Sequence, residues 1–264
     1  MTHPDGQTSF FNDASIGGGP SLKDVNQYAA YLGIEVPTTD VFCEHLKDSG
    51  FIVFDLKNSN KLILDVGEVG PTYQPGHAHA DTLSFELSLE GQRVFVNSGT
   101  SLYGEGTQRE WQRGTSAHNT VVVNNKNSSD VWAGFRVGKR AQPQGLQVHH
   151  DKVFCSHNGY KGINHHREWR VSEHELSVVD TLTGYIKSAV AHYYLHPEIT
   201  ILNKNENEVQ LKLKNGKILN VSFEGGFSFL IQDTQWFPEF GRSVPNKCLK
   251  VEIKNKTLTM QTKW

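Results

Sequence analysis

Short segments of alternating apolar and polar residues fill the chain after residue 50, and this pattern predicts β-strands. Side chains at every second position of an extended segment point to the same face, so alternation indicates strands that are buried on one side. Gly, Asn and Asp residues separate the segments at spacings of about 8 to 12 residues, which is typical of antiparallel sandwiches. The predicted strands are "FIVFDL" (51–56), "KLILDV" (61–66), "TLSFELSL" (82–89), "QRVFVN" (92–97), "NTVVVN" (119–124), "HREWRV" (166–171), "ELSVVDTL" (175–182), "AVAHYYL" (189–195), "VQLKLK" (209–214), "KILNVSF" (217–223), "FSFLIQ" (227–232), "LKVEIK" (249–254) and "TLTMQT" (257–262).

Three pairs of predicted strands are joined by short polar turns, which indicates β-hairpins. The turns are "KNSN" at 57–60, Glu90-Gly91 and Asn215-Gly216. A chain of 264 residues can bury one large core, and all-β domains of this size often form a single unit. We therefore predict an all-β fold in which two large antiparallel sheets pack face to face as a sandwich.

One segment near the N-terminus has the pattern of an α-helix. Ser21 is a suitable N-cap with Asp24 three residues later, and the helix is expected to end before Gly33. Its apolar positions recur at three-to-four spacing: Val25, Tyr28, Ala29 and Leu32. We predict that residues 1–45 are a linker and helix remaining from a preceding domain, and that residues 46–264 form the β-sandwich domain.

Composition and charge exclude several function classes. The formal net charge of −2, from 26 basic and 28 acidic residues, offers no electrostatic basis for binding nucleic acid or an anionic membrane. No stretch of 18 apolar residues predicts a transmembrane helix. The N-terminus lacks the basic and apolar regions of a secretory signal. The three cysteines, which are far apart, are expected to be free buried thiols: Cys43, Cys155 and Cys248.

The stretch "GHAHADTLSFEL" (76–87) places His77, His79 and Asp81 at alternate positions where a strand is predicted to begin. In an extended backbone these side chains lie on one face, next to the inner strand that pairs with the strand containing Phe95. Such a row could be a metal site, an acid/base site or a polar edge. We expect Asp81 to be a structural turn or cap residue rather than a ligand.

Other histidines are candidates for the same site or for solvent exposure. His118, in "TSAHNTVVV", also lies where a loop enters a strand, and imidazoles with a carboxylate are common zinc ligands. Histidines that are adjacent in the sequence face opposite ways on a strand, and we expect both such pairs to be solvated. These pairs are His149-His150 and His165-His166.

A long polar segment between two predicted strands, 97–120, is expected to be a functional loop. It contains Tyr103, Arg109, Trp111 and Arg113. Arginine binds carboxylates and sulfates with its planar guanidinium, and aromatic faces suit sugar rings, so these four residues are candidates for binding a substrate. The alternative is that the two arginines fix the loop through salt bridges.

These motifs together resemble the heparinase II/III-like polysaccharide lyases. The resemblance rests on "YQPGHAHADTLSFELSLEGQRVFVNSGT" (73–100) and "TSAHNTVVVN" (115–124). Further pieces agree: "PDGQTSFFNDAS" (4–15), "WAGFRVGKRA" (132–141), "YYLHP" (193–197) and "WFPEFGRSVP" (236–245). The match covers nearly the whole chain.

The resemblance implies a fold, a reaction and roles for several residues. In that family a helical (α/α) toroid precedes an antiparallel β-sandwich, and the active site lies between them. The implied reaction is β-elimination on a polysaccharide that contains uronic acid, which requires proton transfer and neutralisation of a carboxylate. His77 matches the active-site histidine of the sandwich, and a metal position of some members matches His79, Asn97 and His118. A periplasmic or secreted location is also implied.

Two departures from the family pattern limit what is expected of this chain. Asn97 stands where the family usually has aspartate, and a neutral amide is a weaker ligand for zinc or another divalent cation. The sequence thus leaves open a metal site and a hydrogen-bonded cluster without metal, although we expect His79 and His118 to lie close together. No helical array of toroid size fits into residues 1–45, so we expect half of an active site and no lyase activity from the chain alone.

Three functions are compatible with the sequence. The leading hypothesis is the C-terminal sandwich of a polysaccharide lyase that acts on an acidic polysaccharide together with a toroid. The second is a non-catalytic carbohydrate-binding or assembly module. The third, a cupin-like metalloenzyme, is disfavoured because no glutamate follows the His-x-His pair at the spacing of that fold.

Overall fold

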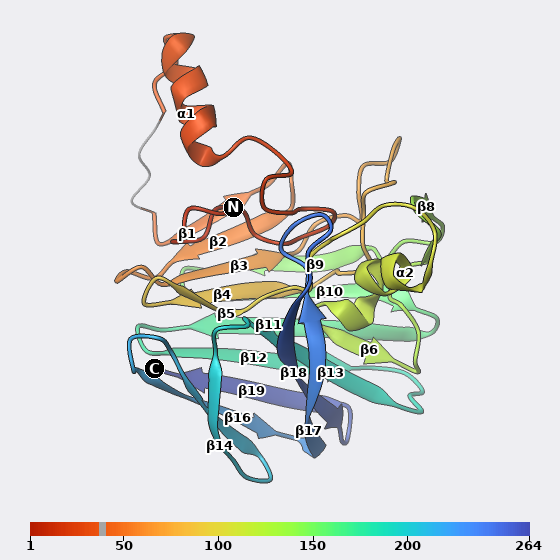
Figure 1. Cartoon of the computed structure of the whole chain (residues 1–264). Coiled ribbons are helices and arrows are strands. Elements are labelled where there is room, and N and C mark those ends of the chain that lie inside the picture. Colours follow the sequence, from red (N-terminus) through yellow and green to blue (C-terminus); the bar gives the residue numbers. More distant parts are fainter. Residues whose placement is uncertain (37–40) are drawn as a thin grey trace.

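The chain forms two large antiparallel β-sheets packed face to face (Figure 1), in a computed structural model that describes residues 1–36 and 41–264. Neither described helix is long and apolar enough to cross a membrane. The first sheet contains, in spatial order, β1 (Cys43–Leu46), β2 (Phe51–Asp55), β3 (Lys61–Asp65), β4 (Phe85–Leu89), β5 (Gln92–Phe95), β13 (Ala189–Leu195), β18 (Val244–Ile253) and β17 (Gly226–Trp236), with β6 (Val121–Val123) paired to β13.

The second sheet has eight strands and covers the inner face of the first. In spatial order it contains β14 (Thr200–Lys204), β15 (Glu208–Lys212), β16 (Ile218–Glu224), β19 (Thr257–Lys263), β12 (Glu175–Leu182), β11 (Ile163–Val171), β10 (Lys152–Tyr160) and β9 (Pro143–Val148). A small hairpin and three helical segments complete the fold: β7 (Val131–Trp132), β8 (Arg136–Val137), α1 (Leu22–Tyr31), α2 (Thr107–Arg113) and the 3-10 turn η1 (Thr115–Ala117). The predicted all-β sandwich is confirmed.

A single large hydrophobic core fills the space between the sheets. Alternate residues of β4 enter it, namely Phe85, Leu87 and Leu89, and residues such as Trp169 and Val178 enter from the opposite sheet. Each fully buried aliphatic or aromatic side chain contributes about 1.5–3 kcal/mol to stability by leaving water. The alternation that predicted these strands is therefore the same feature that holds the sheets together.

The three predicted hairpins are confirmed by the pairing of β2 with β3, β4 with β5, and β15 with β16. At one of these turns Glu90 and Gly91 both have positive φ, 52° and 78°, as a tight two-residue turn of type I′ requires. The predicted strand at 82–89 is too long, because it begins only at Phe85. Leu83 has a φ of 64°, which breaks the extended backbone just before the strand.

The segment 97–120, which was predicted to be a long loop, contains the helical segments α2 and η1. The side chains that α2 buries are polar: Arg109, Gln112 and Arg113. The buried side of α2 is therefore polar. A search for apolar residues at helical spacing could not detect this helix.

The N-terminal helix forms as predicted but packs differently from an ordinary amphipathic helix. Ser21 and Asp24 form the capping box, and Leu32 is the C-cap. None of its residues is buried, and α1 projects away from the sheets (Figure 1). Its apolar side chains, including Leu22, Val25 and Tyr28, are exposed to solvent.

The residues before this helix lie on the outer face of the first sheet, across β4. His3 bridges the Ser88 hydroxyl and the Glu86 carboxylate with its two ring nitrogens, at 2.8 Å each. The other oxygen of Glu86 accepts a hydrogen bond from the backbone N–H of Asn97 at 2.7 Å. These buried polar contacts fix the N-terminal segment on the sandwich. The domain boundary at residue 45 stays a prediction.

The three cysteines are free, as predicted, with Cys155 and Cys248 buried and Cys43 half-buried.

Candidate functional site

The carboxylate of Asp13, on the N-terminal segment, is the centre of the candidate site. It accepts hydrogen bonds from His77 Nδ1 at 2.9 Å, from His79 Nε2 at 2.8 Å and from Arg109 Nη2 at 2.7 Å. A second bond from Arg109 Nη1 makes the arginine pair bidentate. Three segments far apart in the sequence therefore meet at one buried anion.

Hydrogen bonding keeps this carboxylate ionised. Burial alone would raise the pKa of Asp13, but hydrogen bonds from His79 and Arg109, together with their charges, hold that pKa well below its ordinary value. An ionised carboxylate can only accept hydrogen bonds. Both histidine nitrogens that face Asp13 must therefore carry protons.

The outward nitrogen of His77, Nε2, can consequently act as a base. The side chain of His77 is 60% exposed, and its Nδ1–H is held by Asp13. In the neutral imidazole the remaining nitrogen, Nε2, then has an unshared lone pair. This arrangement orients a proton acceptor, in the way that a carboxylate orients the histidine of a catalytic triad.

An aromatic surface surrounds the imidazole of His77. The ring centroids of Tyr103 and Phe135 lie 5.7 and 5.5 Å from that of His77. The Arg109 guanidinium lies over both of these rings, at 5.1 Å from Tyr103 and 5.6 Å from Phe135. Phe240 packs edge-on against Tyr103 at 4.8 Å, and all three aromatic residues are exposed. Aromatic faces of this kind suit the apolar faces of sugar rings.

A cavity of about 670 Å³ opens beside this surface. Its lining includes Asp13, Tyr103 and Phe240, and it also includes Leu22 and Val25 of α1. The exposed apolar side of α1 thus borders the same hollow as the candidate site.

A second pair of ring nitrogens meets behind His77, as predicted for His79 and His118. Their nitrogens Nδ1 and Nε2 are 3.1 Å apart. His118 Nδ1 donates to the carbonyl of Gly114 at 2.8 Å, while His79 Nε2 donates to Asp13. In their neutral forms both facing nitrogens therefore have lone pairs and no proton, so this contact lacks a donor.

Either an additional proton or a metal ion would satisfy both nitrogens. Burial lowers the pKa of His118 to about 4, so a proton is held poorly there. A carboxylate oxygen of Asp81 lies close by, and the ligand atoms of His79, Asp81 and His118 are all within 4.8 Å of one another. Each histidine also donates its other N–H to an acceptor, as zinc-bound histidines usually do. The donor set fits a divalent cation such as zinc.

Asp81 begins a local turn, because its backbone carbonyl accepts a hydrogen bond from the N–H of Ser84 at 2.9 Å. Its carboxylate accepts a hydrogen bond from the backbone N–H of Asn12 at 3.1 Å, far away in the sequence. It also faces Asp65, whose pKa is raised well above the ordinary value by burial and by the charge of Asp81. The expected structural role of Asp81 stays a prediction, and its carboxylate also lies beside His79 and His118.

Asn97, the third predicted ligand, makes other contacts. Its side-chain oxygen accepts from the backbone N–H of Asn119 at 3.0 Å, and its side-chain nitrogen donates to Ser84 Oγ at 3.4 Å. Both ends of the amide thus connect loops. The role of Asn97 as a metal ligand stays a prediction. The carboxylate of Asp81, in contrast, lies close to the ring nitrogens of His79 and His118.

The residues predicted to bind substrate are distributed differently from expectation. Only Tyr103 lies exposed next to His77. Arg109 is buried against Asp13, in agreement with the salt-bridge alternative. Arg113 is buried too, and burial together with the charge of Arg109 lowers its pKa to about 10. Trp111 packs against Tyr194 and Phe237, away from the Asp13 contacts.

Arg113 has a positioning role that differs from both expectations. Its guanidinium donates to the carbonyls of Gly76 and Ala78, at 3.2 and 3.0 Å, on either side of His77. It also donates to the carbonyls of Trp132 and Ala133, at 3.2 and 3.3 Å. This arginine therefore holds the histidine loop against the β7–β8 hairpin, and it is not directed into solvent.

Asp13 was missed in the sequence because nothing in its spacing connects it to His77, which lies 64 positions further along the chain. Phe135 and Phe240 were missed for the same reason. All three lie in segments that resemble the lyase family, at 4–15, 132–141 and 236–245. The only available signal was therefore their membership in these segments.

Comparisons with known proteins agree with the geometry. The family model "Heparinase II/III-like, C-terminal" matches residues 43–264. A heparin-sulfate lyase of Bacteroides stercoris is 31% identical over 191 residues, which is 69% of this chain and 28% of that protein.

Solved structures share the fold. Heparinase III, the BT4657 gene product, superposes with a TM-score of 0.77 at 21% identity, over 99% of this chain and 44% of that one. Heparan sulfate lyase HepC from Pedobacter heparinus gives a TM-score of 0.79 at 18% identity, over 100% and 44%. The chain thus spans less than half of the length of these relatives.

Proposed function

The chain belongs to the heparinase II/III-like family, to which it is related as the C-terminal domain, and we propose that it supplies one side of the active site of a polysaccharide lyase. The proposed reaction is β-elimination on a glycan that contains uronic acid. The observation that carries the proposal is the Asp13–His77 pair, in which a buried carboxylate orients an exposed imidazole.

His77 would use Nε2 to accept the proton from the carbon next to the uronate carboxylate, or it would share in the transfer of that proton. Asp13 keeps the proton on Nδ1 and stabilises the imidazolium that forms. Tyr103 and Phe135 would support the sugar ring, while Arg109 holds Asp13 in place beneath them. None of these roles requires a movement of these side chains from their positions in the structure.

Arg109 and Arg113 are buried on protein groups and are therefore not available to neutralise the substrate carboxylate. We propose that a preceding helical toroid, as the family resemblance implies, supplies that function and the second proton-transfer group. We expect such a domain to enclose the sugar beside the cavity that Asp13, Tyr103 and residues of α1 line. Without it, orientation of the substrate, which can contribute roughly 7–11 kcal/mol, would be mostly lost.

A divalent cation at His79, Asp81 and His118 would have a structural role. When bound, it would replace the missing proton between the two imidazoles and would fix His79 against Asp13. Because Asp13 also holds His77, this would stabilise the orientation of the proposed catalytic histidine. A periplasmic or secreted location, which the family implies, stays a prediction.

Formation of the unsaturated uronate product, followed by its absorbance, tests the proposal. A protein that combines this chain with its toroid is expected to cleave a uronate polymer such as heparan sulfate, and the chain alone is expected to show no turnover. His77→Ala should lower kcat roughly 10²- to 10⁴-fold, the usual contribution of a general acid or base. His174→Ala, at an exposed position, serves as the control.

Full activity of the His77→Ala protein would contradict the proposed role of His77. A non-catalytic binding module would retain glycan binding and show no product in any form of the protein. Product from the chain alone would show that the active site lies elsewhere.

A further inference from the structure

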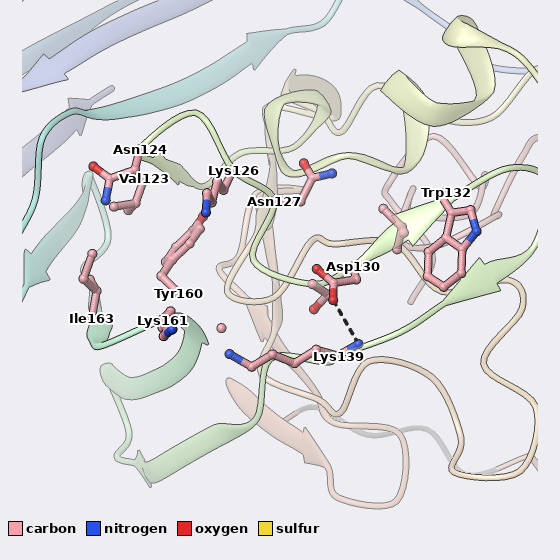
Figure 2. A pocket seen from close by; sticks show the side chains of 13 residues that line it. Val123, Asn124, Lys126, Asn127, Asp130, Trp132, Lys139, Tyr160, Lys161 and Ile163 are labelled. Atoms are coloured by element: carbon pink, nitrogen blue, oxygen red, sulfur yellow. Dashed lines mark hydrogen bonds between the residues drawn. The ribbon is translucent and has the colours of Figure 1, made fainter.

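A second hollow lies beside strand β7, and Figure 2 shows side chains that line it. It has a volume of about 570 Å³ and shares no lining residue with the Asp13–His77 site. Its lining comes from the segment after β6, from the hairpin and from the turn between β10 and β11: Val123, Asn124, Lys126, Asn127, Ser129, Asp130, Val131, Trp132, Lys139, Gly159, Tyr160, Lys161 and Ile163. No part of the proposed reaction uses it.

The charge of this hollow is positive, although the whole chain has a net charge of −2. Lys126, Lys139 and Lys161 contribute three ammonium groups against a single carboxylate. That carboxylate, Asp130, accepts a hydrogen bond from the backbone N–H of Lys139 at 3.3 Å. Within residues 1–36 and 41–264, the lysine ion pairs involve other lysines: Lys61, Lys152, Lys214, Lys217, Lys247 and Lys263.

The neutral polar groups around the hollow also favour an anion. Asn124 uses its side-chain oxygen to accept the backbone N–H of Lys187 at 2.8 Å, and Asn127 uses its oxygen to accept that of Thr115 at 2.9 Å. The acceptor end of each amide is thus engaged with the backbone, and the NH₂ end remains available as a donor. Trp132, whose surface is 48% exposed, adds an aromatic side chain at one edge.

The β7–β8 hairpin connects this hollow to the candidate site. Trp132 lines the hollow, while Phe135 of the same hairpin packs against the imidazole of His77 at 5.5 Å. They are three positions apart in the sequence, so their Cα atoms are at most about 11 Å apart. Arg113 bonds to the carbonyls of Trp132 and Ala133, which fixes the hairpin relative to the histidine loop.

We propose that this hollow is an accessory subsite for the anionic groups of an acidic polysaccharide, and that one glycan chain reaches it from His77 across the hairpin. Lys126, Lys139 and Lys161 bind carboxylate or sulfate groups, and Trp132 packs against a sugar ring. The inference rests on the proposed function, because it extends the same substrate beyond the reacting sugar. It assigns to this chain a part in holding the polymer that is separate from proton transfer.

Calorimetric binding of short heparin oligosaccharides to this chain tests the subsite. The triple variant Lys126→Gln, Lys139→Gln, Lys161→Gln is expected to bind roughly tenfold more weakly, with a smaller dependence of affinity on salt. A matched triple variant, Lys57→Gln, Lys212→Gln, Lys254→Gln, removes the same charge from exposed positions elsewhere and should bind like the unmodified chain. Chemically desulfated heparin in a parallel titration separates carboxylate binding from sulfate binding.

The indole N–H signal of Trp132 in a nitrogen–proton correlation spectrum provides a local readout. We expect this signal to shift as the oligosaccharide saturates the chain, and to shift much less in the lysine triple variant. Equal affinity of the two triple variants, or an unmoved Trp132 signal at saturation, would overturn the subsite.

The subsite and the proposed function can fail separately. If the lysines prove irrelevant while the complete enzyme depends on His77, only the subsite is refuted. If glycan binding depends on the lysines while the complete enzyme does not need His77, the role of His77 is refuted and the subsite stands.

Discussion

Two buried clusters in this protein each bring a pair of histidines together with an aspartate, and they differ in which ring nitrogens carry the protons. The first is the candidate site, where His79 meets His118 beside Asp13. The second lies between the sheets on β10, β11 and β12, where His157 meets His165 beside Asp180. The distances between the paired ring nitrogens are similar, 3.1 and 3.2 Å.

In the cluster between the sheets every hydrogen bond has a donor and an acceptor. The backbone N–H of Gly159 donates to His157 Nδ1 at 3.1 Å, so His157 has its proton on Nε2. That proton is donated to His165 Nδ1, and His165 Nε2 then donates to Asp180 at 2.6 Å. Both imidazoles are neutral, in line with the lowered pKa values that burial gives them.

In the candidate site the corresponding chain of hydrogen bonds cannot close. Both outer nitrogens donate, to Asp13 and to the carbonyl of Gly114, and both inner nitrogens are left as acceptors. We therefore interpret the cluster between the sheets as structural. We expect the pair in the candidate site to take up a further proton or a metal ion.

The largest expected effect comes from breaking the structural cluster. Arg167 makes a bidentate ion pair with Asp180 and donates to the carbonyls of Leu83 and Asn119, at 2.7 and 2.6 Å. Arg167→Met should lower the free energy of unfolding by about 3–5 kcal/mol, because it leaves a buried carboxylate unpaired. Urea denaturation measures this loss.

The control for this substitution is Arg170→Met on the same strand, where the side chain is exposed and little change is expected. The double variant Arg167→Met, Asp180→Leu should recover part of the lost stability, since it removes both charges. A loss below about 1 kcal/mol for Arg167→Met would mean that the pair does not support the sandwich.

The structural cluster also shows what could be predicted from the sequence and what could not. His165 was expected to be solvated, yet it is fully buried. Trp169 and Val171 on β11 point into the core, so the alternation of the strand places Arg167 and His165 on the same inner face. The signal was present, but polar side chains on an inner face do not stand out in a hydrophobic pattern.

Other parts of the fold differed in how far they could be predicted. The hairpins around 57–60, Glu90-Gly91 and Asn215-Gly216 were predictable because turn residues and alternation agree there. Helix α2 was not, because arginines form its buried side. In the site, proximity of His79 to His118 followed from the family resemblance, whereas Asp13 depends on contacts across the chain that no local pattern records.

Zinc binding should distinguish the two histidine clusters, with the second-largest expected effect. Zinc titrated into the metal-free chain is expected to bind at one equivalent, at the candidate site alone, because the His157–His165 pair already shares a proton. Asp13→Asn should weaken zinc binding about 10- to 100-fold through its contact with His79. Calorimetry and elemental analysis provide the measurement.

His174→Ala, at an exposed position, should bind zinc like the unmodified chain. Metal well below one equivalent would show that a proton fills the gap between His79 and His118. Two equivalents would contradict the distinction between the two clusters.

The smallest expected effect concerns pH. Burial and the nearby Lys250 lower the pKa of His192 to about 3, whereas an unfolded histidine has a pKa of about 6.5. At His192, therefore, the unfolded chain binds more protons than the folded chain below about pH 6.5. The contribution of this residue to the free energy of unfolding falls as the pH decreases. His192→Gln should reduce this slope by up to about 1.4 kcal/mol per pH unit between roughly pH 6 and 4.

Unfolding measured in urea at several pH values, for both proteins, gives the difference between the slopes. Groups such as Asp65, whose raised pKa acts in the opposite direction, are common to both proteins and cancel. Identical slopes would mean that His192 is protonated in the folded chain.

The proposed function depends most directly on the position of the proton in His77, which nitrogen NMR of imidazole-labelled protein reports. In this chain the neutral imidazole of His77 should carry its proton on Nδ1, which faces the Asp13 carboxylate. The Asp13→Asn variant should lose much of that preference. A proton on Nε2 of His77 in the unmodified chain would mean that the exposed nitrogen cannot act as a base, and would contradict the proposed mechanism.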